Sequence, residues 1–501
     1  MLTIPRKSHI IARFTMLIFL FILFSFTTSL ADSLPDQPHY HYLIVTKFSQ
    51  TGTLSWAVQS LQATVNELAN PPSYCFIRIY YILVDEDGNI YVSLSNYRGA
   101  TLYQSKIFKY LPDSTENWSA SNLSQVFKKM DMDSFNNIFT LGYYDSLNES
   151  RIYKVNKNGD WIWAKKCLFD DKNIQVNDFT LFDYGNYIVT GGVNIEGNVK
   201  CVTVKYDSDG NEIWNATYDG PDSGEDVANS ITNDSQGNVY ITGKSWSDAT
   251  GFDFLTIKYN SDGEEQWNVR SFNDESEIND EAQAIKTDEE GNVYVTGITC
   301  PDKSCGFFTV KYDNDGNEFW KHFYDSENNI TATKLLVDDE GNVYVHGVSS
   351  ESTADTIKYD ADGNVEWFVS DEKYGLERPY FDIDTDGNIV VLAGSEFGYI
   401  KYDTEGNKIS DVEYTDEEVF NLFAHALAVD NDGNVILSGV CEEIGDVINP
   451  SPEDDDGDDD DGCGGCTVST SASSTPIYLT FFMLLIGFIF LVPRLFLGRH
   501  T

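Results

Sequence analysis

A pattern that recurs eight times constrains the fold of this 501-residue chain more than any other feature. A Lys in an apolar run is followed five residues later by Gly and nine residues later by Trp. Ser replaces the Gly after Lys109 and the Trp after Lys401, and seven of the nine tryptophans of the chain occupy the repeated position. Such regularity predicts an array of similar structural units. The six complete copies are Lys47/Gly52/Trp56, Lys154/Gly159/Trp163, Lys205/Gly210/Trp214, Lys258/Gly263/Trp267, Lys311/Gly316/Trp320 and Lys358/Gly363/Trp367.

A second motif alternates with the first, and its spacing indicates the kind of unit. An Asn, usually after Gly, opens a β-rich run, as in 238–243, and successive copies lie 46 to 54 residues apart. The segments lack a 3.6-residue period, and turns such as 260–263 carry the Asp, Asn and Gly of tight hairpins. A period near fifty residues fits a four-stranded propeller blade. The copies are Asn89, Asn137, Asn186, Asn238, Asn292, Asn342, Asn388 and Asn434.

The order of the motifs predicts how the ring closes. The series starts with the Lys47 copy and ends with the Asn434 copy, so strands from both ends would complete one blade and leave no open sheet edge. We therefore expect an all-β, eight-bladed propeller over residues 42–447, with seven blades as the alternative. Residues 57–70 have apolar side chains at helical spacing and predict a short helical insert. We expect the repeated Trp to pack between blades and the repeated Lys to offset nearby carboxylates.

The two ends of the chain predict export. Residues 1–31 combine a basic start, an apolar stretch and small residues before Asp32, as in a secretory signal peptide, with an uncleaved anchor as the alternative. Residues 448–476 form an acidic linker that contains Cys463-Gly-Gly-Cys466. Residues 477–493 are an uncharged candidate transmembrane helix, and residues 494–501 a basic tail that favours the cytoplasmic side.

This C-terminal arrangement resembles the tripartite sorting signals of prokaryotic surface proteins, especially those with a Gly-Cys motif. The resemblance implies that Cys463 or Cys466 marks a processing or modification site. A permanent single-span anchor is the equal alternative. Either outcome predicts an exported protein at the cell surface or the outer face of a membrane.

The repeats themselves resemble the SBBP family of β-propeller repeat proteins, on segments such as 204–214 and 237–243. The resemblance extends over about four hundred residues and implies a propeller on a secreted or surface protein, with no common catalytic set. The Trp spacing also resembles the tryptophan-docking repeat of eight-bladed quinoprotein dehydrogenases. No residues match the quinone pocket of those enzymes.

One turn resembles the opening of a calcium loop. Asp382, Asp384 and Asp386 alternate before Gly387, which makes Ca²⁺ a possible cofactor. Ala393, however, stands at the twelfth position, where a bidentate Glu is expected. An Asp-rich hairpin turn is the competing interpretation.

Catalytic motifs and cysteine patterns add little. The histidines are scattered, and no nucleophile or zinc motif is present, so we do not expect an enzyme. Cys300 and Cys305 bracket a short loop and predict a disulfide in an oxidising compartment. The pairing of Cys75, Cys167, Cys201 and Cys441 stays open.

Charge and topology together bound the function. The chain has 33 Lys and Arg against 80 Asp and Glu, and its net charge of −47 excludes a protein that binds nucleic acid through phosphates. The Gly-containing turns of every blade fall on one face, so the longer loops form the opposite face, where recognition is expected. We expect a binding, adhesion or scaffold module for an extracellular protein or glycan. The alternative is an extracellular enzyme, a polysaccharide lyase or hydrolase or a quinoprotein-like protein, marked by non-repeated polar residues around the channel. The candidate ligand-face residues are Glu225, Asp226, Asp280 and Glu281.

Overall fold

The computed structural model describes thirteen stretches of the chain, all between residues 39 and 444. The predicted signal peptide, acidic linker, transmembrane helix and basic tail lie outside the described residues. No helix within these stretches is long and apolar enough to cross a membrane. The described residues are 39–64, 75–98, 101–122, 125–144, 147–222, 224–271, 280–300, 305–325, 330–349, 353–371, 380–393, 397–415 and 420–444.

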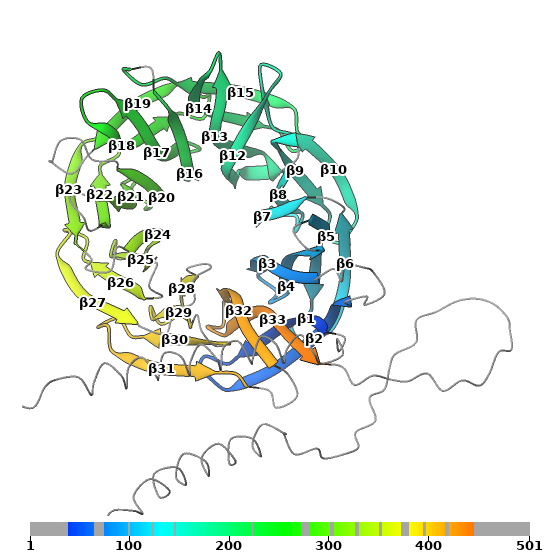
Figure 1. Ribbon diagram of the computed structural model, residues 1–501. Helices are drawn as coiled ribbons and strands as arrows, with labels where there is room; N and C mark the ends of the chain where they lie inside the picture. Colours follow the sequence, from blue (N-terminus) through cyan, green and yellow to red (C-terminus); the bar gives the residue numbers. More distant parts are fainter. Residues whose placement is uncertain are drawn as a thin grey trace, which may run out of the picture. The chain divides into compact units, whose positions relative to one another are not determined.

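These residues form eight antiparallel sheets arranged as the blades of a ring (Figure 1). Seven blades follow one another along the chain. Blade 1 contains β3 (Cys75–Val84), β4 (Ile90–Arg98), β5 (Thr101–Tyr110) and β6 (Glu116–Asn122). Blade 2 contains β7 (Val126–Met132), β8 (Ile138–Tyr144), β9 (Glu149–Val155) and β10 (Trp161–Lys166). Blade 3 contains β11 (Leu168–Phe169), β12 (Lys172–Leu181), β13 (Tyr187–Ile195), β14 (Asn198–Tyr206) and β15 (Glu212–Tyr218). A 3₁₀ turn, η2 (Asp183–Gly185), connects β12 to β13.

Blades 4 to 7 follow the same order from the innermost to the outermost strand. Blade 4 contains β16 (Asp226–Asn233), β17 (Val239–Ser247), β18 (Gly251–Tyr259) and β19 (Glu265–Ser271), and blade 5 contains β20 (Glu281–Thr287), β21 (Val293–Thr299), β22 (Gly306–Tyr312) and β23 (Glu318–Tyr324). Blade 6 contains β24 (Ile330–Val337), β25 (Val343–Ser349), β26 (Ala354–Tyr359) and β27 (Val365–Asp371). Blade 7 contains β28 (Phe381–Ile383), β29 (Ile389–Ala393), β30 (Gly398–Tyr402) and β31 (Lys408–Glu413).

The eighth blade joins the two ends of the described chain. Strands β1 (His39–Phe48) and β2 (Leu54–Thr64) pair with β33 (Val435–Ile444) and β32 (Phe420–Val429), in the order β2-β1-β33-β32. Leu43 lies opposite Val440 in this pairing. Each innermost strand contacts the innermost strands of both neighbouring blades, so the ring is closed. The eight-bladed prediction is confirmed, and the seven-bladed alternative is wrong.

The structure contradicts the predicted helical insert over residues 57–64. Residues 57–64 continue strand β2, in which Leu61 pairs with Tyr42 of β1, while residues 65–70 lie outside the described residues. The cross-strand partner satisfies the backbone groups of this segment, so tertiary pairing overrides the helical spacing of its apolar residues.

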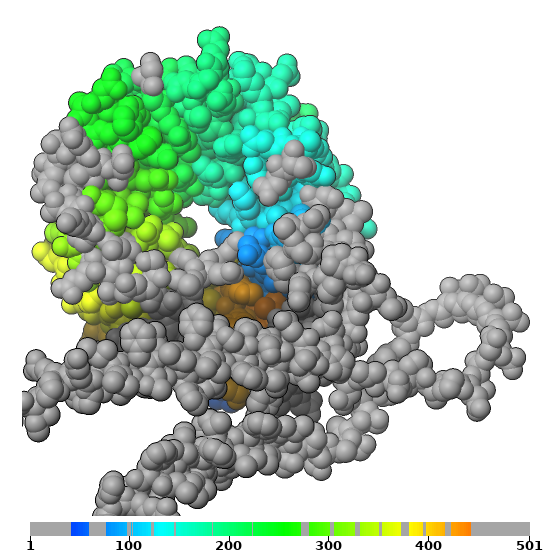
Figure 2. All heavy atoms as spheres, viewed as in Figure 1, coloured from blue at the N-terminus to red at the C-terminus, as the bar shows by residue number. Residues whose placement is uncertain are grey.

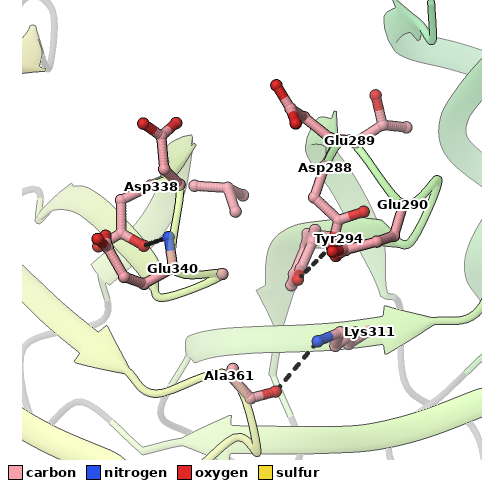
Figure 3. A pocket seen from close by; sticks show the side chains of 12 residues that line it. Asp288, Glu289, Glu290, Tyr294, Lys311, Asp338, Glu340 and Ala361 are labelled. Atoms are coloured by element: carbon pink, nitrogen blue, oxygen red, sulfur yellow. Dashed lines mark hydrogen bonds between the residues drawn. The ribbon is translucent and has the colours of Figure 1, made fainter.

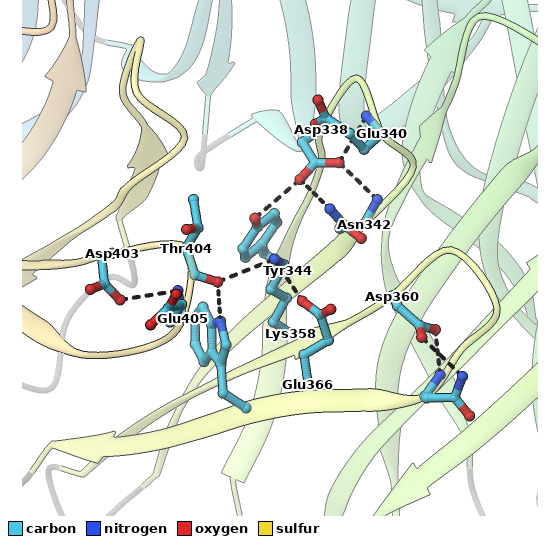
Figure 4. Close-up of polar contacts among 12 residues, drawn as sticks. Asp338, Glu340, Asn342, Tyr344, Lys358, Asp360, Glu366, Asp403, Thr404 and Glu405 are labelled. Carbon is cyan, nitrogen blue, oxygen red and sulfur yellow. Dashed lines mark hydrogen bonds and ion pairs between the residues drawn. The ribbon is translucent and has the colours of Figure 1, made fainter.

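The repeated Trp joins neighbouring blades, as predicted. In six of the seven copies its indole N–H donates to a backbone carbonyl in the outer turn of the next blade, at 2.9 to 3.2 Å. The repeated Lys often donates to the same oxygen: Trp367 and Lys358 both bond to the carbonyl of Thr404 (Figure 4). Four carbonyls are shared in this way, those of Ser261, Asn314, Ala361 and Thr404.

The Lys side chain also offsets carboxylates in some blades, as expected. Lys401 pairs with Asp384 at 2.8 Å, and Lys47 pairs with Asp430 at 2.8 Å. Lys358 pairs with Glu366 at 2.7 Å and lies over the ring of Tyr344 (Figure 4). One side chain therefore combines an inter-blade hydrogen bond with local charge compensation.

The Asp that opens the inner turn organises the second motif. In blade 6, Asp338 accepts from the backbone and side-chain nitrogens of Asn342 and from the hydroxyl of Tyr344 (Figure 4). Such an Asp satisfies the donors of a tight turn from within the turn itself. The repeated Asp and Asn residues are therefore structural, which accounts for part of the negative charge.

We predict that Gly363→Ala destabilises the ring more than Gly197→Ala. Both glycines have φ near +90°, so each substitution imposes backbone strain. A Cβ at Gly363 would lie 2.7 Å from the ring of Trp320, whereas a Cβ at Gly197 would meet nothing within 4 Å. The clash should cost about 1 to 3 kcal/mol beyond the strain. Thermal and urea unfolding of the two variants measures the difference, and equal losses would show that the Trp contact carries no weight.

Candidate functional site

The innermost strands bring together the side chains that depart from the repeat. These strands surround an opening at the centre of the ring, which we call the central channel (Figures 1 and 2). Three residues before the inner turn, every blade has a buried apolar side chain: Ile82, Met130, Phe179, Ile231, Ile285, Leu335, Phe381 and Leu427.

Two flanking positions of the same strands vary strongly from blade to blade. Four residues before the turn stand Tyr81, Lys129, Asp178, Ser230, Ala284, Lys334, Tyr380 and Ala426. Two residues before the turn stand Leu83, Asp131, Thr180, Thr232, Lys286, Leu336, Asp382 and Ala428. Three lysines and three aspartates thus border the central channel. This set, which we call the channel charges, is the candidate functional site.

Lys129 and Asp178 form the best-ordered part of this set. The ammonium of Lys129 in blade 2 lies 2.6 Å from the carboxylate of Asp178 in blade 3 and donates to the carbonyl of Phe179 at 2.7 Å. Asp178 also accepts from the hydroxyl of Ser230 and the backbone N–H of Ile231 in blade 4, both at 3.1 Å. Burial is the largest single influence and disfavours the charged ammonium, but the charge and hydrogen bond of Asp178, with Tyr81 and Asp131, together outweigh it, so the pKa of Lys129 is raised.

Lys334 and Asp382 also form hydrogen bonds to neighbouring blades, on the other side of the ring. Lys334 in blade 6 donates to the carbonyl of Phe381 in blade 7 at 2.6 Å. Asp382 accepts from the backbone N–H of Val429 in blade 8 at 3.1 Å. Burial lowers the pKa of Lys334, which the charge of Asp382 partly opposes, and burial raises the pKa of Asp131. The polar groups of the channel therefore link one innermost strand to the next.

Lys286 differs from the other channel charges. Within the described residues, its ammonium has no hydrogen bond or ion pair, and its side chain is exposed. Desolvation is nevertheless the main cause of the lowered pKa of Lys286, followed by repulsion from Lys129. A side chain that protein surrounds but solvent still reaches is one that projects into a channel.

The predicted ligand-face carboxylates divide into two kinds. Glu225 and Glu281 lie on either side of the ammonium of Lys244, at 3.4 and 3.7 Å. Asp226 and Asp280 are fully buried instead, and Asp226 accepts from the backbone N–H of Gly220 at 2.7 Å. Burial raises the pKa of Asp226. Asp226 and Asp280 therefore do not present carboxylates on the ligand face as predicted, because they stand at the start of an innermost strand and turn into their blades.

The candidate calcium loop is a hairpin turn in the structure. Asp384 accepts from Asn388 and pairs with Lys401, while Asp382 accepts from Val429 and Asp386 accepts from Gln50 at 2.5 Å. The three carboxylates therefore point to separate protein partners. In the part of the chain that the structure describes, no group of three or more His, Cys, Asp or Glu side chains could hold a metal ion.

Two of the cysteines form a disulfide, and others are buried within the blades. Cys300 and Cys305 form a disulfide, as the spacing predicts. Cys167 and Cys201 are buried, and burial raises the pKa of both thiols. Cys463 and Cys466 lie outside the described residues.

His346 occupies a position held by Thr in several other blades, and its ring contacts the hydroxyl of Thr356 at 2.8 Å. Burial, followed by the charge of Lys334, lowers the pKa of His346 to about 3. At neutral pH this side chain is uncharged and sealed from solvent, so it does not offer an accessible catalytic base.

The sequence interpretation missed a cavity on the turn face, opposite the predicted ligand face. The cavity lies between blades 5 and 6, has a volume of about 430 Å³ and is lined by six carboxylate residues and Lys311 (Figure 3). Asp288 accepts from the hydroxyl of Tyr294 at 2.9 Å, and Lys311 donates to the carbonyl of Ala361 at 3.1 Å. The adjacent acidic turns 288–290 and 338–340 were the available signal, but each resembles an ordinary hairpin turn when read alone.

Comparisons with known proteins support the fold and leave the activity open. The β-propeller repeat family SBBP matches residues 220–248, and the arylsulfotransferase (ASST) family matches residues 309–454. No curated protein matches the chain. The structure is similar to the Dos1 propeller, with a TM-score of 0.51, 11% identity and coverage of 74% of this chain and 95% of that one. It is also similar to Sqt1 from Chaetomium thermophilum, with a TM-score of 0.50, 8% identity and coverage of 73% and 96%. At such identities the likeness shows the propeller fold alone.

We predict that His346→Thr makes the stability of the ring less sensitive to acid. The folded-state pKa of His346 lies below the ordinary value of about 6.5, so its stabilising contribution is full above pH 6.5 and declines as the pH falls. The decline should be about 1.4 kcal/mol per pH unit. The variant restores the Thr pair seen between Thr296 and Thr309 in blade 5. Thermal unfolding at pH 7.5 and pH 5 tests the idea, and an unchanged pH dependence in the variant would contradict it.

Proposed function

We propose that the chain is an exported β-propeller binding module that acts in adhesion or as a scaffold at the cell surface. Its partner would be an extracellular protein or glycan that reaches the central channel. The observation that carries this proposal is the contrast within the ring: the outer motifs repeat, whereas the channel charges do not. A repeated residue serves the scaffold, and a non-repeated polar residue on a rigid scaffold is where recognition is expected.

Features at the two ends of the chain support the location. The apolar stretch before Asp32 suits a secretory signal, and the acidic residues 453–461 suit a spacer that holds the ring away from a membrane surface. Residues 477–493 would anchor the protein or serve as a sorting signal, with Cys463 or Cys466 as the processing site.

A second candidate function is sulfuryl transfer between extracellular small molecules. The match of residues 309–454 to the arylsulfotransferase family favours it, because those residues include Asp382 of the channel. Ammonium groups such as those of Lys129, Lys286 and Lys334 suit an anionic sulfate ester. Of the histidines in the matched segment, His346 is too buried to serve as a nucleophile.

We predict that a bulky side chain in the channel abolishes binding. Thr333 is an exposed residue of the innermost strand β24, so Thr333→Trp should obstruct the channel. The control is Ile162→Trp, which adds similar bulk to an outermost strand, where Ile162 is 52% exposed. Wild-type protein and both variants would be tested on immobilised acidic and neutral glycans and on intact cells.

The module proposal requires that the wild type and Ile162→Trp bind and that Thr333→Trp does not. Equal binding by both variants, or no binding by the wild type, would contradict it. Release of 4-nitrophenol from 4-nitrophenyl sulfate in the presence of a phenol acceptor tests the second candidate. Turnover by the wild type that Thr333→Trp lacks would favour the enzyme.

A further inference from the structure

Lys286 occupies a position where other blades make a bond to their neighbour. Two residues before the inner turn, Asp382 accepts from the backbone N–H of Val429, and Thr180 donates to the side-chain oxygen of Asn233 at 3.0 Å. Asp131 likewise accepts from the backbone of Leu181. A lysine ammonium has no acceptor to offer a backbone N–H. Within the described residues its ammonium also donates to no carbonyl, unlike those of Lys129 and Lys334, so Lys286 does not take part in the linkage between innermost strands.

The surroundings of Lys286 place its ammonium in the central channel. It extends from blade 5, yet the charges that act on its pKa are Lys129 and Asp131 of blade 2, Asp178 of blade 3 and Asp382 of blade 7. None of blades 2, 3 and 7 is a neighbour of blade 5 in the ring (Figure 1). The side chain of Lys286 is exposed on the innermost strand β20, and the innermost strands surround the opening at the ring centre (Figure 1).

The charges nearby leave Lys286 without a counter-ion among the described residues. Asp178 is held by Lys129, and Asp382 is held by Val429. Lys286 in turn contributes to the lowered pKa of Lys334, so positive charges face one another in the channel. A partly desolvated cation beside other cations is stabilised by an anion that supplies oxygen acceptors.

We propose that Lys286 anchors an oxyanion-binding site in the central channel, which takes the sulfate, phosphate or carboxylate group of a larger ligand. Lys129 and Lys334 add long-range attraction from the channel wall. This inference deepens the proposed function by naming the ligand class, that of acidic glycans or other anion-bearing extracellular molecules. It is compatible with a net charge of −47, because three lysines border the channel, while much of the negative charge lies in turns and in the 453–461 run.

The test is a titration of the purified full chain with simple anions. Sulfate, phosphate and acetate are added in separate arms, with sodium chloride keeping the ionic strength constant, and calorimetry measures affinity. Lys286→Gln should weaken binding about tenfold or more, the loss expected for one charge-assisted hydrogen bond. Lys172→Gln removes an exposed ammonium from blade 3 and should leave the affinity unchanged.

Two further measurements separate binding from folding. The melting temperature of Lys286→Gln without added anion should equal that of the wild type, because Lys286 has no hydrogen-bond or ion-pair partner within the described residues. Acetylation of lysines followed by mass spectrometry should show that the bound anion protects Lys286 and leaves Lys172 reactive. Equal affinity in wild type and Lys286→Gln, no binding of any of the three anions, or protection that spares Lys286 would overturn the proposal.

The outcome is distinguishable from failure of the proposed function. Anion binding at Lys286 in a protein that binds no glycan or cell would overturn the binding-module proposal alone. Glycan binding that Thr333→Trp abolishes but Lys286→Gln leaves intact would overturn the oxyanion site alone.

Discussion

The ring depends on one contact, in which a Trp and a Lys from one blade donate to a single backbone carbonyl of the next. In blade 5, Trp320 and Lys311 share the carbonyl of Ala361, and the indole lies against Gly363 in the same turn. A carbonyl oxygen has two lone pairs and can accept from both donors. Four carbonyls are shared in this way, and other junctions keep the Trp or the Lys bond alone, as Lys401 does to the carbonyl of Gln50, so bonds of this kind position the turns against the preceding blades.

Closure of the ring gives the innermost strands their particular role. Side chains on the outer strands repeat because every blade must make the same contact, whereas the innermost strands face an opening that the scaffold does not need to fill. Lys129, Asp178 and Lys334 use this freedom to link neighbouring blades. Lys286 makes no such link within the described residues, and we propose that it binds an anion instead. The net charge of the protein therefore says little about a partner, and the proposed function rests on the channel charges instead.

Much of the fold could be predicted from the repeats, and much of the site could not. The Lys, Gly and Trp spacing predicted the blades, the closure and the packing of Trp. The Asp382 turn resembled a calcium loop because one residue type serves both hairpins and metal sites, and only the positions of Lys401 and Gln50 distinguish the two. The burial of Asp226 and Asp280 could not be predicted, because it depends on the direction in which each strand enters its blade.

The sequence alone determined the architecture, because a pattern of strands and tight turns repeated eight times, with Trp in seven copies, leaves few ways to satisfy all the backbone groups. Only the tertiary structure decided which side chains share the central channel. Lys129 and Lys286 are more than 150 residues apart and belong to no common motif, yet the charge of one acts on the other. Their proximity follows from ring closure, a global constraint that no local pattern records.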